Sequence, residues 1–336
     1  MQFNGLEALF EAFKELKILI IGDVMLDAYI YGSVDRISPE APVPVLNVTS
    51  RDERLGGAAN VALNVRSFGA TPVLCSVIGE DLTGENFLKL ISESGMSTQG
   101  MIKSDLRMTT RKNRVISTGH QLLRIDEEQS DLLCKKDQQT FLERISALLP
   151  NCNAVILQDY DKGCLDEVVI EQVIAEARRL KIPVAVDPKK RNFSHYKGAT
   201  LFKPNLNELR EGMKMDINPG DLDSIVKAIF ALDHKISCEN YLVTLSEYGV
   251  FAKNKEEEVR HPAHIRSIAD VSGAGDTVIA IAALGIALNL PLAFWAELAN
   301  LGGGIVCEHS GVVPIDVKLL LAEASADQIL LNFFKN

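Results

Sequence analysis

The chain has 336 residues, a net charge of −10 and a hydrophobic content of 47%, which together indicate a globular protein with ample core. The acidic net charge argues against a nucleic-acid partner bound to a basic face. It does not exclude phosphorylated metabolites bound in a local basic pocket. The six cysteines are scattered without a C-x-x-C pair, so buried thiols in a reducing cytosol are expected rather than a zinc site or disulfides.

Apolar runs typical of buried strands alternate along the chain with segments whose apolar residues recur at helical spacing. Strands are predicted at residues 17–22, 72–78, 154–157, 183–186, 200–202 and 241–244. Helices are predicted at residues 58–68, 141–149, 168–180, 274–288 and 292–307. This alternation predicts a three-layer α/β/α fold, with a mainly parallel sheet whose ligands bind beyond the carboxyl ends of the strands.

Two segments interrupt the alternation. Residues 43–50 and 109–126 are extended and only half apolar, and no helix separates the strands of the second segment. We expect an antiparallel flap, a small β-lid formed by about residues 33–52 and 107–127, that excludes water from a site at the strand ends. No linker or repeat is visible, so residues 1–336 are predicted to form one domain with a lid.

No membrane attachment is expected. The amphipathic, partly acidic residues 1–17 lack the features of a signal peptide, and the apolar stretch 279–290 is too short to span a bilayer. A cytoplasmic location is therefore expected.

The segment from Asp270 to Thr277 contains two glycines and two aspartates directly before an apolar helix. A glycine-rich turn that opens a helix directs free N–H groups and the positive end of the helix dipole at one point, which makes an anion site. Asp276 lies in the first helical turn, where its charge would repel a bound anion. A catalytic base beside a transferring phosphoryl group explains that position, and an ordinary helix cap fits the same letters.

Polar side chains also follow the other predicted strands. The run Gly22 to Asp27 places carboxylates, which suit sugar hydroxyls, after the first strand. Gly56 to Asn60 opens the next helix with small residues that let a ligand approach the backbone. Turn chemistry and simple helix packing are the respective alternatives.

Cations follow two further strands, in Gln158 to Gly163 and Asp187 to Arg191, and suggest an anionic substrate as well as a solvated surface. After the next strand, Asn205 and Glu208 share a helix face. They are oxygen ligands suited to magnesium, and they fit a capping box equally well.

These motifs in this order resemble the ribokinase-like (PfkB) family of carbohydrate kinases. Residues 270–276 match the family's D-x-x-G-A-G-D pattern, residues 56–60 match its N-terminal Gly-Gly signature, and residues 205–208 match N-x-x-E. A closer resemblance is to the bacterial D-glycero-β-D-manno-heptose 7-phosphate kinases of ADP-heptose synthesis, which serves lipopolysaccharide. Residues 36–45 carry that resemblance, helped by 22–27 and 121–126.

The resemblance implies that ATP phosphorylates the anomeric C1 hydroxyl of the heptose 7-phosphate. Asp276 would be the base, and the amides of Gly273, Ala274 and Gly275 would stabilise the transferring phosphoryl group. The implied substrate-binding residues are Asp27, Gly56, Gly57, Asn60, Arg114, Gln121, Arg124 and Asp126, with Lys162 and Lys189 as candidates for the 7-phosphate. The implied nucleotide-binding residues are Asn205, Thr244, Gly249, Asn300 and Gly304. Asn205 and Glu208 would hold Mg²⁺ through water, and Asp270 is a candidate K⁺ ligand.

The sequence departs from the family at Leu301 to Gly304, where relatives prefer alanines. Glycines there are expected to loosen the helix, because each costs about 1 kcal/mol against alanine. No H-x-G-H signature is present, so no nucleotidyltransferase domain is expected. Exposed lid strands predict a homodimer. The alternatives are a PfkB kinase acting on a fructose phosphate or ribose, a non-catalytic sugar sensor, and a dinucleotide-dependent oxidoreductase. A P-loop kinase is excluded because no G-x-x-x-x-G-K-[ST] occurs.

Overall fold

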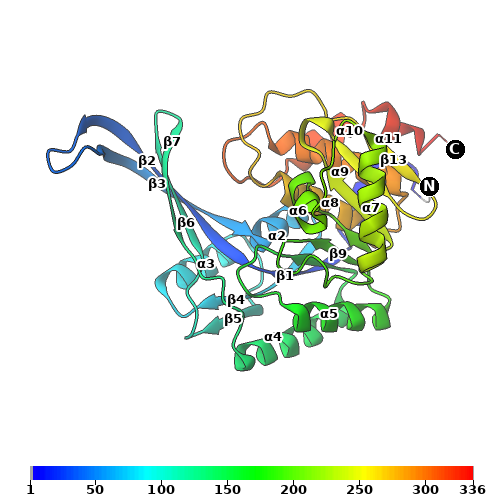
Figure 1. Cartoon of the computed structure of the whole chain (residues 1–336), viewed down its shortest axis with the longest axis horizontal. Helices are drawn as coiled ribbons and strands as arrows, with labels where there is room; N and C mark the ends of the chain where they lie inside the picture. The colour runs from blue at the N-terminus through cyan, green and yellow to red at the C-terminus, as the bar shows by residue number, and fades with distance from the viewer. Residues whose placement is uncertain (1–2, 336) are drawn as a thin grey trace.

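The computed structural model describes residues 3–335, in which a layered α/β body carries a projecting β-lid (Figure 1). Nine strands form the central sheet in the order β13-β12-β11-β10-β9-β8-β1-β4-β5. Neighbouring strands from β11 to β5 run parallel, whereas β12 and β13 are antiparallel additions at one edge. The strand bounds are β1 Lys17–Gly22, β4 Thr71–Gly79, β5 Gly100–Ser104, β8 Ala154–Gln158, β9 Val184–Asp187, β10 Leu201–Phe202, β11 Asn240–Thr244, β12 Val250–Lys253 and β13 Glu258–His261.

Helices cover both faces of this sheet, because its strands are apolar on both sides. In β1, Ile18 and Ile20 join the core beneath one helical layer, and Leu19 and Ile21 join the core beneath the other. The first layer contains α1 Leu6–Phe13, α2 Ala58–Ser67, α3 Leu82–Glu93, α8 Ala274–Ala287, α9 Leu292–Val306, α10 Val317–Ala324 and α11 Gln328–Asn332. The second contains α4 Lys135–Leu148, α5 Glu167–Leu180, α6 Leu206–Met213 and α7 Leu222–Ile236. The predicted three-layer architecture is confirmed.

The lid is a separate four-stranded sheet in the order β3-β2-β6-β7, which extends from the body in Figure 1. Its strands are β2 Val24–Ile37, β3 Pro44–Gly57, β6 Arg111–Ser117 and β7 His120–Glu127. The prediction of an antiparallel flap is partly wrong, because β2 and β6 pair in parallel. The lid also begins earlier than predicted, since the chain enters β2 only one residue after β1 ends.

Glycines in α9 and α8 bring these two helices close together. A Cβ at Gly302 would lie 2.3 Å from Ile281 Cδ1, and one at Gly303 would lie 2.7 Å from Val278 Cγ2. The expectation that the glycine run only loosens α9 therefore needs correction, because the missing side chains make room for α8. Two short 3₁₀ turns, at Leu149–Asn151 and Ser246–Tyr248, complete the elements. Within residues 3–335, none of the helices combines the length and apolar character that crossing a membrane requires.

Candidate active site

Asp276 lies in the first turn of α8 and is buried, with three neighbouring side chains directed at its carboxylate. Asn60 Nδ2 from α2 donates to Oδ2 at 2.8 Å. Tyr160 OH and Gln158 Nε2, from the end of β8, both donate to Oδ1, at 2.7 and 3.1 Å. The structure thus brings the predicted pair Asp276 and Asn60 together, and adds two residues that the sequence did not single out.

Burial is the main influence on the ionisation of Asp276. It raises the pKa of this carboxyl to about 7, against the opposing effect of the hydrogen bonds from Asn60 and Tyr160, while the nearby charge of Asp187 raises it further. A carboxyl with a pKa near neutrality matches the requirement for a general base at physiological pH. The side chain that the sequence marks as a base therefore has a suitable environment for that role.

The turn before Asp276 is shaped by Gly273. This residue is the N-cap of α8 and has φ of +85°, and a Cβ on it would come within 3.0 Å of Asn60 Nδ2. Ala274 N donates weakly to Val271 O at 3.3 Å, whereas no acceptor for the amides of Gly275 and Asp276 is found within residues 3–335. These free amides lie at the positive end of α8 and provide the predicted anion-binding character.

Asp270 ties this turn to the chain that follows α9. Its Oδ1 accepts a hydrogen bond from Ser272 N at 2.9 Å, and its Oδ2 accepts one from Gly311 N at 3.0 Å. Burial alone would raise the pKa of Asp270, but these amide donors outweigh it and lower the pKa. Asp270 is therefore an ionised carboxylate that holds two backbone segments together.

A buried ion pair lies beside the same turn. Lys203 Nζ, at the end of β10, is 3.0 Å from Asp187 Oδ2, and Gln158 Nε2 donates to the same oxygen at 3.2 Å. A Cβ on Gly275 would be 3.7 Å from Lys203 Nζ, which places the ammonium group next to the helix N-terminus. Lys203 is thus a cation within reach of an anion bound at the turn, and the sequence analysis missed it.

The base of the lid contributes a second charged group. Arg114 on β6 forms an ion pair with the buried Asp27 on β2, and its guanidinium lies over the ring of Tyr29. Gly56 makes room for this carboxylate, since a Cβ there would lie 2.1 Å from Asp27 Oδ2. Gly57 takes φ of +62° and is the N-cap of α2. Four predicted substrate-binding residues therefore meet where the lid joins the body.

Asp23 and Asp159 fix the chain that follows β8. Asp23 accepts hydrogen bonds from the amides of Tyr160, Lys162 and Cys164 at 2.9 to 3.0 Å. Burial raises the pKa of Asp159 to about 6, helped by the charge of Asp23 and opposed by donors that include Tyr196 OH at 2.8 Å. These contacts hold Tyr160 in position to reach Asp276.

Three predicted lid residues lie on the outer strand β7. Arg124 Nε donates to Asp126 Oδ1 at 2.9 Å, and Gln121 pairs across the hairpin with Ile116. Their side chains are exposed, and among residues 3–335 neither Arg124 nor Asp126 shares a hydrogen bond or ion pair with Asp276. The structure does not group them with the catalytic turn.

The two lysines suggested for the substrate phosphate already have carboxylate partners. Lys162 Nζ is 2.9 Å from Glu128 Oε1. Lys189 pairs with Glu208 and also lies over the ring of Tyr160. The neighbouring carboxylates of Asp187 and Glu208 raise the pKa of Lys189, although burial alone would lower it.

Asn205 and Glu208 form the capping box that the sequence allowed. Asn205 Oδ1 accepts from Glu208 N, and Glu208 Oε2 accepts from Asn205 N, both at 2.8 Å. Thr244 forms a β-bridge with Asn205, so these two predicted nucleotide-site residues adjoin. Glu208 keeps its other oxygen directed at Lys189, which shows that this oxygen attracts a cation.

The remaining predicted nucleotide-site residues surround the chain from Pro262 to Arg266. Gly249 has φ of +83°, and a Cβ on it would meet the backbone of residues 261–263. Asn300 Nδ2 donates to Pro262 O at 2.8 Å, and Gly304 lies against Arg266. Glu297, buried beneath this segment, is hydrogen-bonded to His264 at 2.9 Å.

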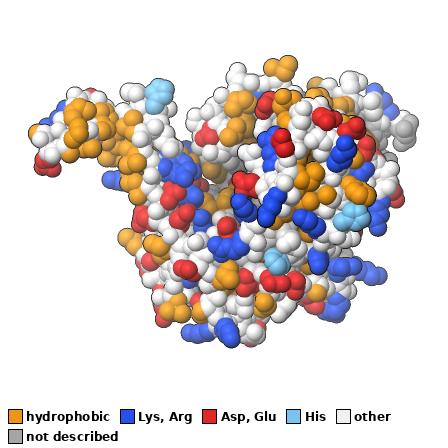
Figure 2. Space-filling view, in the orientation of Figure 1, with side chains coloured by type: hydrophobic (Ala, Val, Ile, Leu, Met, Phe, Trp, Pro, Cys, Tyr) orange, Lys and Arg blue, Asp and Glu red, His pale blue; other side chains and the backbone are white. Residues whose placement is uncertain are grey.

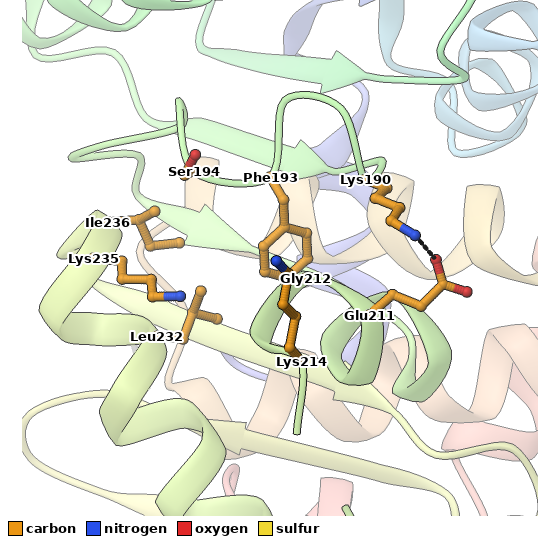
Figure 3. A pocket seen from close by; sticks show the side chains of 9 residues that line it. All are labelled: Lys190, Phe193, Ser194, Glu211, Gly212, Lys214, Leu232, Lys235 and Ile236. Carbon is orange, nitrogen blue, oxygen red and sulfur yellow. Dashed lines mark ion pairs between the residues drawn. The ribbon is translucent and has the colours of Figure 1, made fainter. Parts of the chain in front are cut away.

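The molecular surface agrees with this placement. Figure 2 shows acidic and basic side chains gathered where the lid joins the body, and hydrophobic side chains along the lid. A separate hollow of about 270 Å³ has none of the residues that contact Asp276 in its lining. Its Lys190, which also follows a strand end, points toward Glu211, and their side chains form an ion pair at 3.3 Å (Figure 3).

Comparison with known proteins agrees with the geometry. Residues 15–317 match the pfkB family carbohydrate kinase pattern. The chain belongs to the pfkB family. Its members transfer a phosphoryl group to a sugar hydroxyl, and their chemistry implies ATP and Mg²⁺.

The chain is similar in sequence to curated relatives and similar in fold to a solved structure. The chain is 41% identical over 312 residues to the bifunctional protein HldE of Methylobacillus flagellatus, covering 93% of this chain and 64% of that protein. It is 37% identical to HldE of Pelobacter propionicus, covering 99% and 69%. The chain thus spans about two thirds of the length of these relatives. Phosphofructokinase-2 from Escherichia coli, in complex with substrates and products, shares the fold with a TM-score of 0.77 at 18% identity, covering 92% of this chain and 99% of that one.

Proposed function

We propose that this pfkB kinase uses ATP to phosphorylate the C1 hydroxyl of D-glycero-β-D-manno-heptose 7-phosphate, giving the 1,7-bisphosphate used in ADP-heptose synthesis. The observation that carries the phosphoryl transfer is the buried carboxylate of Asp276 beside free amides at the N-terminus of α8. The heptose acceptor is supported by residues 36–45 and by the HldE relatives.

The reaction needs an acceptor for the hydroxyl proton and stabilisation of phosphoryl charge. Asp276 takes the proton of the sugar hydroxyl as that oxygen attacks the γ-phosphorus of ATP. The bond from this phosphorus to the oxygen that bridges it to the β-phosphate breaks, and ADP leaves. The amides of Gly275 and Asp276, with Lys203, lie where charge develops on the phosphoryl oxygens. Each such donor typically contributes about 3 kcal/mol to the transition state. Ala274 contributes less than its neighbours, because its amide already bonds to Val271 O.

The proposed magnesium ligands are Asn205 and Glu208. Asn205 and Glu208 supply oxygens of the kind Mg²⁺ prefers, and one Glu208 oxygen already holds a cationic partner in Lys189. We propose that these two residues hold the hydrated ion, which neutralises charge on the ATP phosphates when bound. Thr244, Gly249, Asn300 and Gly304 would then border the nucleotide.

At the sugar end, we propose that Asp27, Asn60 and the backbone at Gly56 and Gly57 bind hydroxyl groups. Arg114 can leave Asp27 for an anionic substrate, and Lys162 and Lys189 remain the proposed phosphate ligands, each exchanging a carboxylate partner for the phosphate. Gln121, Arg124 and Asp126 contribute only if the lid folds over the site.

A substrate screen with product identification tests the proposal. The purified protein is incubated with ATP, Mg²⁺ and either heptose 7-phosphate, fructose 1-phosphate, fructose 6-phosphate or ribose, and products are identified by NMR. We expect phosphorylation at C1 of the heptose. The heptose assignment fails if that sugar is not turned over while another is, and kinase activity itself fails if none is.

Asp276→Asn tests the base. General-base removal costs about 10²- to 10⁴-fold in rate, so we expect near-complete loss of turnover with sugar binding retained. Asp223→Asn, an exposed aspartate in the first turn of α7, is the matched control and should keep the parent rate. A turnover number for Asp276→Asn within tenfold of the parent excludes Asp276 as the base.

Asp270 is the proposed ligand of an activating K⁺ ion. Its carboxylate holds two backbone segments beside the catalytic turn, so a cation there would act on the position of the turn. We expect the rate to be higher in KCl than in NaCl at equal ionic strength, and we expect this difference to vanish in Asp270→Asn. Equal rates in both salts would remove the K⁺ assignment.

We also propose that the lid mediates a homodimer. The lid carries several exposed apolar side chains, namely Ile37, Val43, Val48, Leu122, Leu123 and Ile125. Such a surface on open strands is costly in water and suits pairing with a second copy. Sedimentation should show a dimer that Leu123→Glu dissociates, while Phe230→Glu, at an exposed site on α7, leaves it intact. A monomer at micromolar concentration contradicts the proposal.

A further inference from the structure

Two buried side-chain oxygens next to Asp276 have no hydrogen-bond partner among residues 3–335. They are Asn60 Oδ1 and Gln158 Oε1, and both residues are at most 1% exposed. A buried acceptor left unpaired is costly, so each such atom in a folded protein calls for an explanation. Because both atoms lie beside the catalytic carboxylate, a bound ligand is the natural partner.

The orientation of the Gln158 amide is fixed by its surroundings. Its nitrogen donates to two carboxylates, Asp276 Oδ1 at 3.1 Å and Asp187 Oδ2 at 3.2 Å. Turning the amide over would direct its oxygen at two acceptors and lose both bonds. The nitrogen of Asn60 is held in the same way by Asp276 Oδ2 at 2.8 Å. Both oxygens are therefore left as acceptors on the two sides of Asp276.

The partner that these oxygens require is a donor. Phosphate oxygens of ATP are acceptors and cannot satisfy them, and the neighbouring Asp187 and Asp276 are acceptors when ionised. Sugar hydroxyls are donors, and a polyol presents several next to the one that reacts. The chemistry therefore points to the sugar rather than the nucleotide as the ligand of Gln158.

Resting on the proposed sugar-kinase function, we propose that Gln158 is a substrate-binding residue. Its Oε1 accepts a hydrogen bond from a sugar hydroxyl other than the one phosphorylated, while its Nε2 keeps Asp276 and Asp187 in place. Tyr160, two residues later, is a positioning residue whose hydroxyl donates only to the base. One short segment at the end of β8 thus binds a sugar hydroxyl through Gln158 and orients the carboxylate of Asp276 through Tyr160.

The test combines variants with substrates that each lack one hydroxyl. Rates are measured for heptose 7-phosphate and its 2-, 3- and 4-deoxy analogues, with wild type and Gln158→Met. Methionine matches the length of the side chain and offers only a weak sulfur acceptor. We expect one analogue to lose about 10- to 100-fold in kcat/KM with wild type, because Oε1 is left unpaired. With Gln158→Met, kcat/KM for this analogue should be close to kcat/KM for the full substrate, because the variant has already lost the amide oxygen. Equal losses in both proteins for every analogue overturn the assignment of Gln158.

Two further variants separate recognition from positioning. Gln158→Glu keeps an acceptor oxygen but replaces the amide donor, so it should still discriminate against the deoxy analogue. Tyr160→Phe removes only the donor to Asp276, so it should also keep that discrimination. Both variants should shift the acid limb of the kcat/KM profile to higher pH, because each removes a group that favours the ionised base. If Tyr160→Phe leaves this limb unmoved, Tyr160 does not position the base.

These outcomes are distinct from failure of the proposed function. If wild type does not phosphorylate heptose 7-phosphate, the substrate proposal fails before the variants are compared. The same design then applies to the deoxy analogues of the sugar that is turned over. Trp295, the single tryptophan of the chain, is buried in α9, and its emission checks that each variant is folded.

Discussion

The clearest consequence of the site geometry is that Asp276 should reduce the stability of the folded protein as pH rises. Burial raises the folded-state pKa of Asp276 from 3.8 to about 7. Below pH 3.8 the carboxyl is protonated in both states and imposes no penalty. Between pH 3.8 and 7 the unfolded chain loses this proton while the folded protein keeps it, so stability falls with pH and stays lower above 7.

The magnitude follows from the same shift. Each pH unit in this window changes the free energy of unfolding by about 1.36 kcal/mol. Between pH 5 and pH 7 the wild type should therefore lose about 2 kcal/mol relative to Asp276→Asn, which cannot ionise, because the folded carboxyl is itself half ionised by pH 7. The hydrogen bonds that asparagine alters contribute an offset, but that offset does not change with pH.

Equilibrium urea unfolding of both proteins at pH 5, 6, 7 and 8 measures this difference. The control is Asp270→Asn, because the folded-state pKa of Asp270 is lowered and this group stays ionised throughout that range. Its difference from wild type should be the same at every pH. If the difference for Asp276→Asn is also constant, the carboxylate is ionised at pH 5 and the reasoning from burial is wrong.

Three further results are expected. The kcat/KM of the wild type should fall about tenfold per pH unit below pH 7 as the proposed base Asp276 takes up a proton, and a plateau extending to pH 5 would contradict this. Gly285→Ala should lower stability by about 1–3 kcal/mol in thermal unfolding, because the new Cβ would lie 2.4 Å from Trp295 Cβ; a higher Tm would show that helix propensity outweighs the clash. Glu208→Gln should raise the Mg²⁺ concentration for half-maximal rate several-fold, while the exposed control Glu211→Gln does not; unchanged Mg²⁺ dependence removes Glu208 from the metal site.

The body of the fold was predictable because burial on two faces leaves a direct pattern in the sequence. A run such as Lys17–Gly22 has apolar residues at every position from Ile18 to Ile21, as a strand covered on both sides requires. The lid was less predictable. Its exposed strands lack such a pattern, and the parallel pairing of β2 with β6 depends on chain segments more than 70 residues apart.

The site likewise has one part that was predictable from the sequence and one part that was not. The Gly273 to Asp276 turn is local, so its glycines and carboxylate reveal it in one stretch of chain. Gln158 and Lys203 were missed because their importance comes from the sheet order, which places β8, β9 and β10 side by side. A polar residue at the last position of an otherwise apolar strand was the available signal for Gln158.

The opposing influences on Asp276 explain why a base can function beside an anion site at all. Burial and the charge of Asp187 favour the protonated form, whereas donors from Asn60 and Tyr160 and the charge of Lys203 favour the ionised form. The balance lies near neutral pH in the protein alone. In the proposed reaction, the phosphates of ATP add negative charge and strengthen the tendency of Asp276 to bind a proton, while the helix amides and Lys203 stabilise that added charge. The proton of the sugar hydroxyl is therefore drawn to Asp276 when the phosphoryl group is in position to accept the attacking oxygen.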